Sequence, residues 1–118
     1  MAPRRIALAR ADGTVVCDNC RVARSFVTRL RGLMASRGLP SGSGLLIPRS
    51  RSVHTHFMRF PIDVVFLDGE NRVVSIVHRL RPWRGAASRR AHAVLELAAG
   101  ECERLGLAAG ETLGEMAT

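Results

Sequence analysis

The sequence contains no lysine and no tyrosine, and its aromatic side chains other than histidine are four phenylalanines and one tryptophan. Without lysine, neither Schiff-base catalysis nor a phosphate-binding P-loop lysine is available. All 18 basic residues are therefore arginine. Because aromatic side chains are so few, we expect a core built mostly from leucine, valine, alanine and isoleucine.

Long apolar runs are also missing. No run approaches the roughly 18 residues of a membrane-spanning helix, so no membrane association is expected. The basic start, Met1 to Arg5, is not followed by the apolar stretch of a secretory signal, and we expect a cytoplasmic protein. The three cysteines, Cys17, Cys20 and Cys102, are an odd number without such a signal, which argues against a disulfide framework.

Common catalytic and nucleotide-binding motifs are absent as well. Gly13, Gly32 and Gly38 do not form G-x-G-x-x-G, and no G-x-x-x-x-G-K occurs. A G-x-S-x-G nucleophile elbow is not found either. The sequence therefore leaves open whether the protein is an enzyme.

What the chain does contain fits one small domain over residues 1–118, with a core from about residue 6 to 113. Its net charge of +8 is unevenly distributed. Residues 1–60 carry eleven arginines against Asp12 and Asp18, about +9, and residues 61–118 carry seven arginines against eight acids, about −1. Either the folded surface mixes these charges into ordinary ion pairs, or a basic face attracts nucleic acid or another polyanion.

Apolar periodicity predicts about eight short strands and two helices. An apolar stripe from Val22 to Leu33 predicts the first helix, with Asp18-Asn19 before it as capping residues. The second helix is expected over Ala99 to Leu105. The strands are expected at Ile6–Ala9, Thr14–Cys17, Leu45–Ile47, residues 53–58, Val64–Leu67, Arg72–Leu80, Ala93–Leu97 and around Thr112-Leu113.

The stretch from residue 51 to 68 organises the chain. Val64 to Leu67 is apolar at every position, which indicates a strand buried on both faces. Upstream, a period of two places His54, His56 and Met58 on one strand face. A proline then interrupts the pattern, and Asp63 stands at the entrance to the buried strand. Polar groups gathered there make a candidate ligand-binding site.

The candidate site consists of His54, His56, Met58, Arg59 and Asp63. The two imidazoles would lie about 6–7 Å apart along the strand, a spacing that suits two ligands of zinc, copper or non-haem iron. The alternative is a polar strand face with hydrogen-bonded histidines. No cofactor is expected beyond a divalent metal that His54 and His56 could hold. For Asp63, a structural role as acceptor for backbone amides or for Arg59 competes with a role as general base or ligand anchor, and the same division applies to the mid-strand Glu96.

Two further features of the sequence each have more than one interpretation. Cys17-x-x-Cys20, expected at a strand-to-helix junction, is either half a zinc site, a redox pair, or two small half-buried residues. In the basic loop from Arg81 to Arg90, Trp83 is either a stacking platform for single-stranded nucleic acid or an apolar side chain folded onto the sheet.

A succession of short motifs extends from about Ile6 to Leu113. They are Arg31-Gly32-Leu33-Met34 with Leu39-Pro40, His54-Thr55, Met58-Arg59, Pro61-Ile62-Asp63-Val64-Val65-Phe66-Leu67-Asp68, Val94-Leu95-Glu96-Leu97-Ala98-Ala99-Gly100, Leu105-Gly106-Leu107 and Gly110-Glu111. In this order they resemble a widespread prokaryotic family, domain of unknown function 192. The resemblance implies a small domain whose strands curl into a partly closed barrel flanked by two helices, and it implies no established activity.

We therefore predict an α+β domain with a small, curled, mostly antiparallel sheet and two short flanking helices. Its predicted function is recognition of a small ligand or a protein partner around His54 to Asp63. The alternatives are an arginine-based binder of nucleic acid or another polyanion, and a small metal-dependent enzyme.

Overall fold

The computed structural model describes residues 4–23, 39–56 and 58–116, and strands dominate them. These residues form nine strands and the helix α2 (Glu101–Leu105). The strands are β1 (Arg5–Ala9), β2 (Val15–Val22), β3 (Ser43–Pro48), β4 (Ser52–His54), β5 (Ile62–Leu67), β6 (Val73–Leu80), β7 (Gly85–Ala87), β8 (Ala93–Ala98) and β9 (Gly114–Glu115). The predicted positions of β1, β3, β5, β6, β8 and α2 are confirmed to within a few residues.

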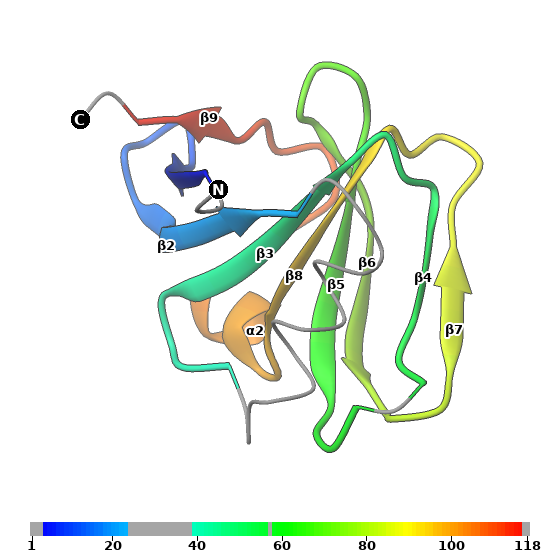
Figure 1. The fold of residues 1–118 in the computed structure, drawn as a ribbon. Coiled ribbons are helices and arrows are strands. Elements are labelled where there is room, and N and C mark those ends of the chain that lie inside the picture. The colour runs from blue at the N-terminus through cyan, green and yellow to red at the C-terminus, as the bar shows by residue number, and fades with distance from the viewer. Residues whose placement is uncertain (1–3, 24–38, 57, 117–118) are drawn as a thin grey trace.

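Seven strands form one curled sheet in the order β6-β5-β8-β3-β2-β1-β9 (Figure 1). Every neighbouring pair that carries a register is antiparallel except β2 and β3, which run parallel. The segment before β9 bonds to the opposite edge of the sheet, because the Val73 amide donates to the Glu111 carbonyl at 2.7 Å and the Gly110 amide to the Val73 carbonyl at 2.8 Å. The two edges therefore approach each other, and the sheet forms a half-barrel.

The prediction of an α+β fold with two flanking helices was only partly right. The described residues are mainly β and contain one short helix, α2. Most of the expected first helix falls on residues 24–38, which lie outside the described residues. Its first residue, Val22, belongs to β2.

Strand β2 continues past the predicted capping residues, and it contains a bulge. Leu8 pairs with Cys17 and Ile6 with Cys20, so one extra residue of β2 is accommodated beside β1. Residues 19–22 then pair with β3. This second partner stabilises the strand where local sequence favoured a helix.

Strand β5 is buried on both faces, as its continuous apolar run predicts. Val65 and Leu67 belong to the core inside the half-barrel, which also contains the cysteines. Val64 and Phe66 belong to a second core on the outer face of the sheet. Within the described residues, no helix is long and apolar enough to span a membrane.

A separate two-stranded ribbon, β4 and β7, packs on the outer core through Val53 and Ala86 (Figure 1). Strand β7 lies inside the stretch that was expected to be a loop, Arg81 to Arg90. Strand β4 ends at His54 and does not extend to residue 58. This early end decides how the candidate residues are arranged.

Candidate functional site

The structure brings the two histidines of the H-x-H motif together at the end of β4. The ring centroids of His54 and His56 are 4.9 Å apart with an angle of 67° between the planes. His56 also meets Trp83, with centroids 5.4 Å apart and an angle of 83°. Edge-to-face contacts of this kind are favourable for aromatic rings. Trp83 is nevertheless 54% exposed, so much of its indole faces solvent.

Met58 does not share the strand face that was predicted for it with His54 and His56. The chain turns after Thr55, and the Met58 amide donates to the Thr55 carbonyl at 3.2 Å. Because the turn breaks the period of two, Met58 enters the outer core beside Phe60. Arg59 follows it on the surface.

Thr55, which was not among the candidate site residues, fixes the position of the tryptophan loop. Its hydroxyl is completely buried, donates to the Arg81 carbonyl at 2.5 Å and accepts from the Arg84 amide at 2.9 Å. Its carbonyl accepts from the Trp83 amide at 2.9 Å. These bonds hold Trp83 at a φ of 64°, a conformation that a bulky residue rarely adopts without support from its surroundings. No local pattern announces this role, because the partners lie more than 25 residues along the chain.

Asp63 accepts backbone hydrogen bonds, as one of its two predicted roles requires. The carboxylate is completely buried and accepts three backbone hydrogen bonds, from Arg79 at 2.9 Å, Gly100 at 3.1 Å and Cys102 at 2.9 Å. None of these donors is Arg59, the nearest candidate in sequence. Asp63 thereby ties the β6 residue Arg79, whose φ is 52°, to the start of α2.

The hypothesis that this region binds a divalent metal rests on two ligands, the imidazoles of His54 and His56. Among the described residues, no three His, Cys, Asp or Glu side chains gather where they could hold an ion. Asp63 is directed toward α2, whereas His54 lies on the ribbon. The other internal carboxylate, Glu96, is completely buried in β8 opposite Val64, whose side chain belongs to the outer core.

Cys17 and Cys20 lie within strand β2, not at a strand-to-helix junction as predicted. Both are completely buried and free, and the intervening bulge lets both face the inner core. The hydrogen bond between the two thiols lowers the pKa of Cys17 and raises the pKa of Cys20. Burial raises the pKa of Cys102. Cys17 and Cys20 therefore pack as two small side chains. Both are buried more deeply than the half-buried positions that were expected for them.

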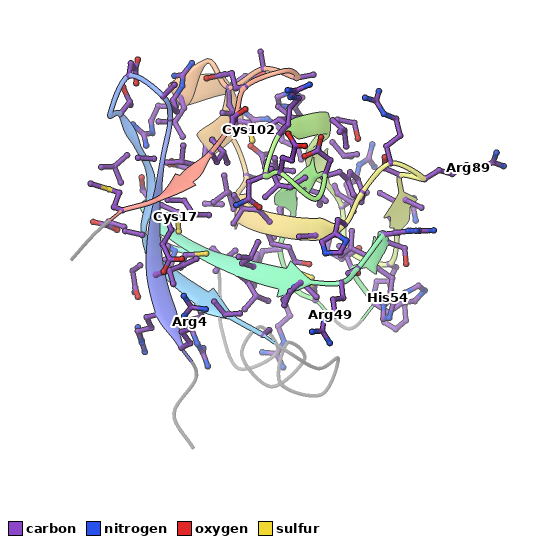
Figure 2. All side chains as sticks on the ribbon, turned by 90° about the horizontal axis from the view of Figure 1, so that it is seen from above. Arg4, Cys17, Arg49, His54, Arg89 and Cys102 are labelled. Carbon is purple, nitrogen blue, oxygen red and sulfur yellow. The ribbon has the colours of Figure 1, made fainter. Side chains whose placement is uncertain are left out.

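The ribbon carries an excess of positive charge, and we define the arginine ribbon as β4 and β7 with their five nearby exposed arginines. These are Arg51, Arg81, Arg84, Arg89 and Arg90. No Asp or Glu occurs between Asp18 and Asp63 or between Glu70 and Glu96, and both strands lie in these acid-free stretches. The ion pairs found among the described residues involve other arginines. Figure 2 shows His54 and Arg89 on this side of the molecule, away from Cys17 and Cys102.

The half-barrel with its attached ribbon defines a small, mainly β domain. The chain belongs to the family DUF192, described as uncharacterized ACR, COG1430, whose model matches residues 7–114. A UPF0127 protein of Thermococcus sibiricus is 34% identical over 79 residues, 64% of this chain and 51% of that protein. A UPF0127 protein of Pyrococcus horikoshii is 40% identical over 67 residues, 54% of this chain and 57% of that protein. The chain thus spans only about half the length of these curated relatives.

Two solved structures share the fold over nearly the whole chain. A protein of Sinorhizobium meliloti 1021, named as a candidate transcription regulator, has a TM-score of 0.80 and 27% identity, covering 97% of this chain and 94% of that one. A protein of unknown function from Novosphingobium aromaticivorans DSM 12444 has a TM-score of 0.77 and 21% identity, covering 97% and 93%. The family is therefore established, together with its fold.

Proposed function

We propose that this protein is a recognition domain that binds single-stranded nucleic acid through the arginine ribbon and Trp83. The surface includes the predicted site residues His54 and His56, which lie beside Trp83, whereas the Asp63 carboxylate is engaged inside the fold. The observation that carries the proposal is an exposed tryptophan, fixed in place, among arginines that lie in acid-free stretches.

The charge of the ribbon supports a polyanionic ligand. An arginine that is paired with a carboxylate has already lost much of its attraction for phosphate. The five arginines of the ribbon take part in none of the ion pairs found among the described residues. Arginine side chains contact phosphate oxygens through their planar, multidentate guanidinium groups. Their attraction for phosphates is expected to fall as salt rises.

Trp83 supports a single-stranded ligand over a purely ionic one. Stacking of one base on an aromatic side chain contributes about 1–3 kcal/mol and tolerates any base. Thr55 and His56 already hold the indole in place, so binding need not order it, and less entropy is lost on association. The description of the Sinorhizobium meliloti relative as a candidate transcription regulator agrees with nucleic-acid binding.

The lone tryptophan provides a direct assay, because the chain has no other tryptophan and no tyrosine. Titration with a fluorophore-free oligothymidylate at low salt should quench the emission of Trp83. Anisotropy of a labelled oligonucleotide then gives the dissociation constant and its salt dependence. The slope of log K against log salt should be negative, by about 0.7 for each phosphate contacted.

Matched variants separate a specific surface from general positive charge. Arg81→Ala with Arg84→Ala should weaken binding and make the salt slope shallower by about 1.4. Arg5→Ala with Arg72→Ala removes the same charge from exposed positions outside the ribbon and should change little. Equal losses in both double variants would reject the arginine ribbon as the binding surface. Retention on heparin without quenching by oligonucleotide would reject the stacking role of Trp83.

A further inference from the structure

A cleft of about 510 Å³ opens at the end of the half-barrel opposite α2. Strands β2, β3 and β5 all finish at this end, because β3 runs parallel to β2 and is separated from β5 by the antiparallel β8. Helix α2 follows the end of β8 and therefore lies at the other end. The cleft is distinct from the arginine ribbon, and its volume falls within the range of pockets that bind small molecules. Barrel mouths are common places for such sites.

The cleft combines an apolar wall with a polar rim. Ile6, Leu8, Leu46 and Leu67 contribute aliphatic surface, and none of the described residues that line the cleft is aromatic. The wall that these aliphatic residues form offers no stacking surface for a nucleobase or another planar ring. Aliphatic side chains instead suit a flexible hydrocarbon chain, whose binding depends on the area that it buries.

Two of the described residues that line the cleft are arginines, and they differ in their pairing with acids. Arg4 and Glu115 both line the cleft and form an ion pair of 2.9 Å with each other. Arg49 lines the same cleft and takes part in none of the ion pairs found among the described residues. Figure 2 labels both arginines. An anionic group at the rim would therefore meet Arg49.

The backbone also holds Arg49 in an uncommon conformation. Four described non-glycine residues have positive φ, and two of them, Arg49 at 54° and Asn71 at 61°, line this cleft. Asparagine adopts this region readily, whereas arginine does so less often. Such conformations persist only where the surrounding structure maintains them, and they are common at ligand-binding sites.

We propose that the cleft binds a small amphipathic anion, an aliphatic chain that ends in a carboxylate. The chain lies along Ile6, Leu46 and Leu67, and the carboxylate faces Arg49 at the rim. The cleft does not depend on the nucleic-acid surface, so either proposal can fail without the other.

Methyl NMR tests this site with an internal control, because the chain contains four isoleucines. Ile6 lines the cleft, and Ile62 is completely buried in the outer core. Octanoate, decanoate and dodecanoate, each added below its micellar concentration, should shift the δ1-methyl signal of Ile6 and leave that of Ile62 in place. Affinity should rise with length by up to about fourfold for each added methylene that becomes buried.

A charge variant tests the end group. Arg49→Asn removes the cation, and asparagine tolerates the positive φ at this position. Decanoate should then bind up to about fivefold more weakly, the range of an exposed ion pair, whereas decanol should bind as it does to the wild type. Arg84→Ala, on the ribbon, should bind decanoate normally.

Three results would overturn the proposal that the cleft binds the aliphatic chain. The first is an unchanged Ile6 signal at saturating dodecanoate, and the second is an equal shift of Ile62, which indicates non-specific partitioning. The third is equal affinity for all three chain lengths. If Arg49→Asn weakens decanol as much as decanoate, Arg49 does not bind the carboxylate.

Discussion

Replacing Asp63 by alanine should destabilise the half-barrel more than any surface change, because three backbone amides lose one shared acceptor. The carboxylate accepts from Arg79, Gly100 and Cys102 at 2.9, 3.1 and 2.9 Å. It is completely buried in β5, and an alanine side chain has no acceptor atom to replace it. The change removes the connection between β6 and the start of α2.

The magnitude follows from how well water can reach each donor. The bonds from Arg79 and Gly100 are partly buried, so these amides can be hydrated at a cost of about 1 kcal/mol each. The Cys102 amide is buried, and an unsatisfied donor there costs about 1–3 kcal/mol. Asp63→Ala should therefore lower the free energy of unfolding by about 3–5 kcal/mol, a large share of the roughly 5–15 kcal/mol of a small domain. Asp63→Asn should cost less, because its carbonyl still accepts on one side.

Urea unfolding followed by far-UV circular dichroism measures these differences, with the m-value as a check that both variants unfold cooperatively. Hydrogen exchange adds a local measurement, since the amides of Arg79, Gly100 and Cys102 should exchange faster in the alanine variant. A loss below about 1 kcal/mol in Asp63→Ala would refute the structural role. In that case the Asp63 carboxylate of the wild type would become a candidate for a functional role instead.

Three further measurements test other parts of the structure. Thr55→Val keeps the side-chain shape but leaves a loop amide without its acceptor, so it should cost about 1–3 kcal/mol and shift the tryptophan emission; an unchanged spectrum and stability would remove Thr55 from its positioning role. The hydrogen bond from Arg10 lowers the pKa of Glu111, so this carboxylate contributes stability above its unfolded pKa of about 4.3. That contribution is lost as the pH falls through the lower pKa of the folded state. The free energy of unfolding of Glu111→Gln should therefore depend less on pH, between about 5 and 2, than that of the wild type. Identical pH profiles of the two proteins would contradict this prediction. Zinc should bind weakly to the wild type and more weakly to His54→Ala, because His54 and His56 provide only two ligands, and identical titrations would reject the histidine site.

The sequence by itself determined the features that depend on residues close together along the chain. The continuous apolar run of β5 predicted burial on both faces, and the structure confirms it. The strands expected at Val64–Leu67 and Arg72–Leu80 require a short turn between them, and in this turn the Asp68 carboxylate accepts from the Glu70 and Arg72 amides at 2.9 Å. Burial of an internal aspartate also required donors, and this requirement follows from the cost of desolvating charge wherever the donors are.

Tertiary structure alone decided which partners each residue would meet. The three donors to Asp63 lie 16, 37 and 39 residues away along the chain, and no local pattern could identify them. Residues 19–22 became strand because β3 offered a parallel partner, which outweighed a local preference for helix. His56 and Trp83 came into contact because the bonds of Thr55 folded the tryptophan loop against the end of β4. Periodicity reports how a segment divides its side chains between faces, but only the closed hydrogen-bond network of the fold determines what lies opposite each face.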